Sequence, residues 1–172
     1  MLRETRFDWC KKQSKGLRLA EPNENLTAVY LRKSRSALNM LDSALEKEEL
    51  EWILDTSYYA KYFAVYALFM RAGIKSQIHD CTIAALKRLF VEEKIVPEGI
   101  LDELERSKEL RVNALYYDKE LGQDEILSRA SKSAGFCLEV ESIIQRLSAD
   151  KISLVRIKFR KNSPISRLSS PR

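Results

Sequence analysis

The sequence contains few of the residues that form tight turns and few of those that form metal and catalytic sites. Its 172 residues include only five glycines, four prolines, three cysteines and one histidine. So few glycines could hardly form a phosphate-binding glycine loop or a dinucleotide-binding motif. A single histidine with widely spaced cysteines excludes a Cys/His zinc site. We therefore expect neither a metal ion nor a cofactor.

The cysteines and the apolar runs exclude further classes of protein. Cys10, Cys81 and Cys137 are odd in number and form no C-x-x-C pair, so we expect each to be a small, buried apolar side chain. No apolar run reaches the roughly 18 residues that a membrane span needs. The first residues also lack the apolar centre of a signal peptide. These features predict a soluble protein of the cytoplasm.

The scarcity of turn residues and the spacing of apolar residues predict long helices. Apolar side chains recur at helical intervals, and Gly73 is a typical residue to follow a helix end. The expected helices cover about residues 26–45, 47–72, 78–93, 97–121 and 123–147. The predicted fold class is therefore all-α, an up-down bundle of four or five helices.

The two ends of the chain are basic, whereas the middle is mildly acidic. Residues 1–20 carry six Lys/Arg and two acidic residues, and residues 151–172 carry seven Lys/Arg and no acidic residue. Basic ends can contact a phosphate backbone or an acidic protein surface. The alternative is that they are solvated ends that keep the protein soluble.

These shifts in composition predict three parts of the chain. A lead-in segment that docks on the core covers residues 1–22, the helical bundle covers 23–148, and a basic tail covers 149–172. Within the tail, residues 152–159 alternate between apolar and basic side chains, which is typical of a strand. We expect the tail to be strand-like or disordered.

The most distinctive stretch is an aromatic, alanine-rich run with no charge between Lys61 and Arg71. A helix this apolar has to be buried on most of its surface, so we expect it to lie at the centre of the bundle. Four tyrosines fall close to one face of it and are expected to pack in the core and at a dimer seam: Tyr58, Tyr59, Tyr62 and Tyr66.

This run and its surroundings resemble the HEPN domain family (higher eukaryotes and prokaryotes nucleotide-binding). The residues that carry the resemblance are Ser57-Tyr58-Tyr59-Ala60-x-Tyr62-Phe63-Ala64-x-Tyr66-Ala67-Leu68, Gly73-Ile74 and Ile78-His79-Asp80-Cys81-Thr82-Ile83-Ala84-Ala85-Leu86. The lead-in, with Trp9-Cys10-Lys11-Lys12-Gln13 and Glu21-Pro22-Asn23, is similar to archaeal members. The likeness spans about residues 5–148 and implies an all-α homodimer that acts on nucleotides or RNA.

In that family the functional motif is an Arg followed, after four to six residues, by a His. The two motifs of a dimer face each other and cleave RNA. The resemblance places Arg111 at the first position, but Tyr116 stands after four intervening residues and Asp118 after six. The expected histidine is therefore missing. The pattern Arg-x-x-Ala-x-Tyr is itself common in one branch of the family.

The missing histidine determines the activity that we expect. A histidine titrates near pH ~6.5 and can take a proton from a 2′-hydroxyl, whereas a tyrosine with a pKa of about 10 is almost wholly protonated at pH 7. We expect a non-catalytic protein in which Arg111 binds the phosphate of a nucleotide or RNA, with Asn113 and Tyr116 beside it. The alternatives are a metal-independent endoribonuclease that uses Arg111 and Tyr116, and a structural adaptor without a ligand.

The resemblance also implies partners. Family members work in toxin–antitoxin modules or beside a minimal nucleotidyltransferase, which transfers AMP to a tyrosine at this end of the motif. Tyr116 and Tyr117 are the acceptor candidates, and packing in the aromatic core is the alternative for both. The single histidine, His79, lies at the start of the third expected helix beside Asp80, and we expect it to be structural.

Overall fold

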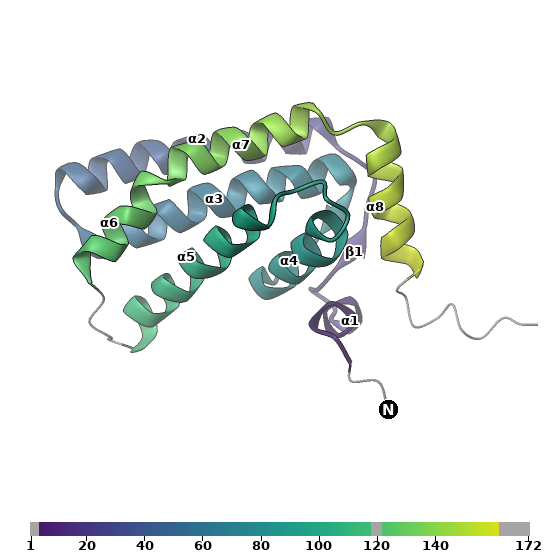
Figure 1. Cartoon of the computed structure of the whole chain (residues 1–172), viewed down its shortest axis with the longest axis horizontal. Helices are drawn as coiled ribbons and strands as arrows, with labels where there is room; N and C mark the ends of the chain where they lie inside the picture. The colour runs from purple at the N-terminus through teal and green to yellow at the C-terminus, as the bar shows by residue number, and fades with distance from the viewer. Residues whose placement is uncertain (1–3, 118–121, 162–172) are drawn as a thin grey trace, which may run out of the picture.

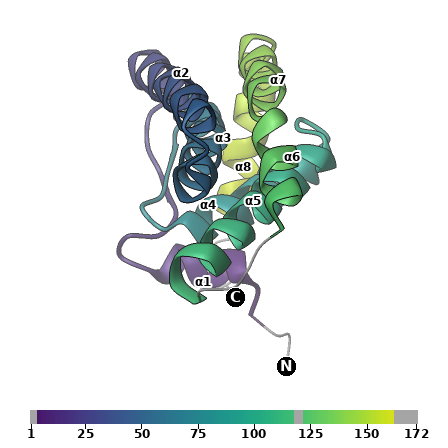
Figure 2. The same cartoon turned by 90° about the vertical axis from the view of Figure 1, so that its left-hand side faces the viewer.

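The computed structural model describes residues 4–117 and 122–161, without the side chains of residues 115–117. Helix α3 (Leu50–Ala72) runs through the centre of the molecule. Helix α2 (Glu24–Glu46) forms a hairpin with it, and α7 (Ser133–Gln145) and α5 (Glu98–Tyr117) cover its other sides (Figures 1 and 2). The predicted all-α bundle around the aromatic helix is confirmed.

Shorter elements complete the fold around this bundle. They are α1 (Arg6–Lys12), β1 (Arg18–Leu19), β2 (Ile74–Lys75), α4 (His79–Ala85), the π-helical segment η1 (Leu86–Val91), α6 (Gln123–Ser131) and α8 (Ala149–Lys161). The two strands pair antiparallel, with Arg18 opposite Lys75 and Leu19 opposite Ile74. No helix in the described part of the chain is both long and apolar enough to cross a membrane.

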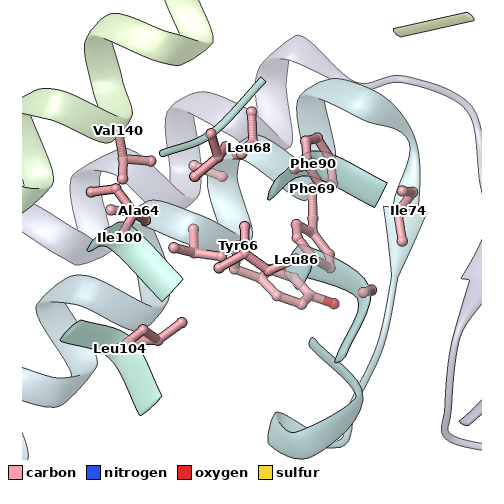
Figure 3. Packing of buried hydrophobic residues seen from close by; sticks show 14 of the residues in the cluster. Ala64, Tyr66, Leu68, Phe69, Ile74, Leu86, Phe90, Ile100, Leu104 and Val140 are labelled. Atoms are coloured by element: carbon pink, nitrogen blue, oxygen red, sulfur yellow. The ribbon is translucent and has the colours of Figure 1, made fainter. Parts of the chain in front are cut away.

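The core is built on the apolar side chains of α3. Ala64, Leu68 and Phe69 are fully buried, and they pack among apolar side chains from η1, α5 and α7 (Figure 3). Phe69 stacks on Phe90 of η1 at 5.3 Å between ring centres. Because fifteen residues of α3 are buried, most of the surface of this helix is covered by its neighbours.

Two predicted helices are interrupted. The one expected over residues 78–93 begins as α4 and continues as the wider turns of η1. The one expected over 123–147 breaks between α6 and α7, where Ser133 is fully buried and its hydroxyl meets that of Ser57 at 2.9 Å. Apolar spacing alone carries no mark of either interruption, because the helical interval continues across both.

The predicted strand over residues 152–159 is wrong, because this segment forms the middle of α8. Val155 and Phe159, four residues apart on one helical face, are buried against the core. Ile157, which an alternating pattern would place beside them, is 47% exposed. The tail is therefore a docked helix as far as Lys161, and residues 162–172 lie outside the described residues.

The expectation for the cysteines is also wrong in part. Cys10 of α1 and Cys81 of α4 are buried as predicted, but they are joined by a disulfide. Cys137 is a free, buried cysteine. The pairing could not be foreseen, because 71 residues separate the two cysteines and only the docking of α1 on α4 brings them together.

The end of α3 depends on Gly73. Its φ of +72° lies in the left-handed region, which residues with a side chain rarely adopt. A Cβ atom there would also lie 2.5 Å from the carbonyl oxygen of Ala20 and 2.7 Å from the nitrogen of Pro22. The lead-in chain therefore passes directly over this glycine.

We predict that Gly73→Ala lowers the free energy of unfolding by about 1–3 kcal/mol, because it adds both backbone strain and a collision. Gly135→Ala is the control, since nothing lies within 4 Å of a Cβ at that position in α7. Alanine there should leave the stability unchanged or raise it by up to about 1 kcal/mol. Urea unfolding measures both, and equal effects would contradict this role of Gly73.

Candidate functional site

Arg111 lies on the face of α5 that contacts α3. Its Nε donates to the carboxylate of Asp55 in an ion pair. The guanidinium carbon lies 5.1 Å from the centre of the Tyr59 ring and 5.5 Å from that of Tyr58. Asp55 and the two rings thus hold a planar cation against an aromatic surface, with 15% of the arginine side chain exposed.

His79 lies in the same cluster, although its position in the sequence is outside the motif. Its Nδ1 is 2.8 Å from the hydroxyl of Tyr58, and its ring stacks on Tyr62 at 4.0 Å. Tyr58 therefore contacts Arg111 through its ring and His79 through its hydroxyl. The Arg-to-His spacing of the motif could not reveal this histidine, because it precedes Arg111 and lies on a different helix.

Burial and nearby cations lower the pKa of His79 below its usual 6.5. Burial is the larger cause, followed by the charges of Arg111 and Lys108, whereas Asp80 acts in the opposite direction. Lys108 forms an ion pair with Asp80. At neutral pH the imidazole is therefore mostly uncharged and able to accept a proton.

Tyr58 is suited to hold this imidazole in place. Burial is the main cause that raises the pKa of the Tyr58 hydroxyl, although the charge of Arg111 lowers it. The hydroxyl consequently keeps its proton at physiological pH, and its oxygen can accept the Nδ1–H of a neutral His79, a tautomer in which Nε2 is unprotonated. Tyr58 can therefore fix the orientation of the His79 ring.

Asn113 is not brought together with Arg111. Two positions along a helix correspond to a rotation of about 200°, and Asn113 instead lines a groove between α4 and α5 with a volume of about 310 Å³. Lys108 also lines this groove, together with the acidic residues Asp80, Glu105 and Glu109. The excess of acidic residues makes this groove a poor phosphate site by itself.

Tyr116 and Tyr117 are the last two residues of α5, and their side chains lie outside the described part of the structure. Their predicted roles, as an RNA contact, a catalytic group or an AMP acceptor, therefore stay predictions. Among the described residues, no group of His, Cys, Asp and Glu could hold a metal ion.

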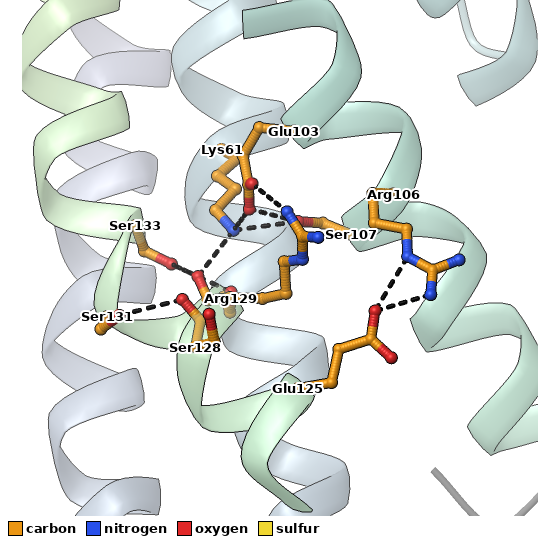
Figure 4. A network of polar contacts seen from close by, with 10 residues as sticks. Lys61, Glu103, Arg106, Ser107, Glu125, Ser128, Arg129, Ser131 and Ser133 are labelled. Carbon is orange, nitrogen blue, oxygen red and sulfur yellow. Dashed lines mark hydrogen bonds and ion pairs between the residues drawn. The ribbon is translucent and has the colours of Figure 1, made fainter. Parts of the chain in front are cut away.

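A second polar cluster surrounds Lys61, which is completely buried in α3 (Figure 4). Its Nζ donates to Glu103 at 2.7 Å, to Ser107 at 2.9 Å and to the carbonyl oxygen of Arg129 at 2.9 Å. Glu103 also accepts from the Arg129 guanidinium at 2.6 Å. Because Lys61 does not reach solvent, this cluster ties α3 to α5 and α6 and is not a second binding site.

The charges in this cluster depend on one another. Burial lowers the pKa of Lys61, and the neighbouring carboxylate of Glu103 opposes that shift. Burial alone would raise the pKa of Glu103, but Lys61 and Arg129 together lower it. Removing the carboxylate would therefore leave a buried ammonium group without its counter-charge.

Comparisons with known proteins match the part of the chain that contains the Arg111 cluster. A family model for the HEPN domain matches residues 27–145. A UPF0332 protein of Thermotoga maritima is 26% identical over 125 residues, which cover 72% of this chain and 95% of that protein. The matched span includes Asp55, Tyr58, His79 and Arg111 and leaves out α1 and α8.

We predict that Glu103→Ala lowers the free energy of unfolding by about 3–5 kcal/mol, because it leaves Lys61 charged and buried. The matched control is Glu109→Ala on the same helix, which removes an exposed pair with Arg106 and should cost less than about 1 kcal/mol. Urea unfolding compares the two variants, and similar costs would contradict a structural role for the Lys61 cluster.

The pKa of His79 can be tested by NMR titration of its ring protons. Arg111→Met and Lys108→Met should each move this pKa up toward 6.5, whereas Asp80→Asn should lower it further. Lys151→Met, on α8, should have no effect. The lowered pKa also makes stability depend on pH. Because the unfolded chain binds the His79 proton more readily than the folded chain, the free energy of unfolding should decrease as the pH falls below 6.5.

Proposed function

The chain belongs to the HEPN domain family, and on that premise we propose that it binds the phosphate and base of a nucleotide or RNA through the cluster around Arg111. The observation that carries this proposal is the guanidinium held by Asp55 over the rings of Tyr58 and Tyr59. A planar cation of this kind recognises phosphate oxygens. Tyr58 is buried, but the ring of Tyr59 is only half-buried and is the one on which a base can stack.

Asp55 gives this arrangement a specific role. Its carboxylate holds the arginine in place when no ligand is present, and a bound phosphate would share or displace that contact. We therefore propose that Asp55 positions Arg111 and limits how tightly a phosphate binds, while Tyr59 offers the half-buried ring closest to the guanidinium.

A second candidate function is favoured by the position of His79. In a metal-independent endoribonuclease, a neutral His79 with its proton on Nδ1, donated to the Tyr58 oxygen, would take the proton of the 2′-hydroxyl on its unprotonated Nε2. The 2′-oxygen would attack the phosphorus, the bond from phosphorus to the 5′-oxygen would break, and the leaving oxygen would take up a proton. Arg111 would stabilise the charge that develops on the phosphate.

His79 would thus act in place of Tyr116, the catalytic partner of Arg111 that the sequence pattern suggests. A neutral imidazole accepts a proton at pH 7 far more readily than the hydroxyl of a tyrosine. The homodimer and the minimal nucleotidyltransferase or toxin–antitoxin partner stay predictions, because the structure describes one chain.

The test is to incubate the full-length protein with single-stranded RNA in EDTA at neutral pH, and to measure binding by anisotropy and cleavage on a gel. Arg111→Ala should weaken binding about tenfold or more, because a charged contact to phosphate is lost. Arg35→Ala, which removes an exposed arginine paired with Glu141, is the matched control and should bind as the wild type does.

The same experiment separates the candidate functions. Cleavage by the wild type that His79→Gln abolishes would assign an endoribonuclease with His79 as its base. If Tyr116→Phe abolishes cleavage and His79→Gln does not, the endoribonuclease uses Tyr116 with Arg111. If the wild type binds neither RNA nor a mononucleotide, the binding proposal is wrong and the adaptor alternative stands.

A further inference from the structure

A row of aromatic side chains continues from the Arg111 cluster across α3 and onto α2. It consists of Tyr59, Phe63 and Tyr30, and we call it the aromatic row. We infer that it binds successive bases of a single-stranded RNA, so that the ligand of this protein is a strand and not an isolated nucleotide. This inference rests on the proposed function and names the substrate class of the same site.

The three rings follow one another across the surface of α3 and α2. Tyr59 and Phe63, four residues apart on α3, stack at 5.5 Å with an angle of 28° between their planes. Phe63 and Tyr30 of α2 lie 6.1 Å apart at 42°. All three side chains are half-buried, whereas the other tyrosines of α3 are buried in the core. The row is therefore more accessible than the tyrosines that α3 buries in the core.

A cation lies at each end of the aromatic row. The exposed side chain of Lys33 places its Nζ 4.8 Å from the Tyr30 ring and 5.7 Å from the Phe63 ring. At the other end, Arg111 lies 5.1 Å from the Tyr59 ring. Aromatic platforms flanked by cations bind single-stranded nucleic acid, because the cations attract the backbone and every base has a face that can stack.

The aromatic row and its two cations favour a single strand over a duplex or a mononucleotide. Bases in a duplex are already stacked and paired, so their faces are not available to the row. A mononucleotide could occupy only one end, where Arg111 and Tyr59 lie together. We therefore expect tight binding only for a strand that reaches from Arg111 to Lys33, with little base preference and a strong dependence on salt.

The experiment uses the full chain and a fluorescent oligouridylate of about eight nucleotides in EDTA, with binding followed by anisotropy. Uridine monophosphate and a duplex of equal length serve as competitors. Phe63→Leu and Tyr30→Leu remove a ring but keep an apolar side chain, and Lys33→Gln removes the charge at an exposed position. Circular dichroism and thermal unfolding establish that each variant folds.

Each ring variant should weaken binding of the oligonucleotide about fivefold or more. Lys33→Gln should reduce the slope of log affinity against log salt by about 0.7, as expected when one phosphate contact of a single strand is lost. None of the three should change the affinity for uridine monophosphate, which depends on Arg111. The matched controls are Trp52→Leu, an exposed aromatic of α3 outside the row, and Arg32→Gln, beside Lys33 and also exposed.

The outcomes distinguish this inference from the proposed function. If Arg111→Ala loses binding while the row variants and controls all bind normally, the strand inference is wrong and the Arg111 site stands. If the wild type binds no oligonucleotide and no monophosphate, both are wrong. If Phe63→Leu converts a dimer into monomers during sedimentation and leaves RNA affinity intact, the row is a seam between two copies of the chain.

Discussion

A helix that is apolar on every side has to be covered on every side, and the position of α3 follows from this constraint. α2, α5 and α7 lie along it because each can bury part of its surface. The one charge in its central run, Lys61, is tolerated because a carboxylate, a hydroxyl and a carbonyl from α5 and α6 converge on its ammonium group. The burial of the apolar surface of α3 and the hydrogen bonds of Lys61 thus determine how the neighbouring helices pack against α3.

The candidate site arises where this covering is incomplete. Along the edge of α3 that α5 and α2 do not fully close, aromatic rings stay half-buried, and cations from both neighbours lie against them. The cluster around Arg111 therefore needs no loop or glycine-rich turn, which agrees with a sequence that has few of either. His79 joins it from α4, so groups from three helices contribute to one small area.

The features predicted correctly from the sequence are those that repeat over many residues. The spans of α2, α3 and α5 follow from long apolar periods, and Gly73 marks a helix end through its own backbone preference. The features that were missed depend on contacts between distant segments: the pairing of Cys10 with Cys81, the break before Ser133, and the helical form of residues 149–161. His79 belongs to the same group, because a motif search looks along one helix and this histidine approaches from another.

The parts of the chain outside the family match contact each other. Lys11 of α1 donates to the carbonyl oxygen of Phe159 at 2.6 Å, and Phe7 meets the ring of Phe159. Arg156 of α8 donates to the carbonyl oxygen of Ala20 at 2.6 Å, over the end of α3. The segments on either side of the matched span thus pack on each other and on the end of α3, so residues outside that span add to the contacts that hold the central helix in place.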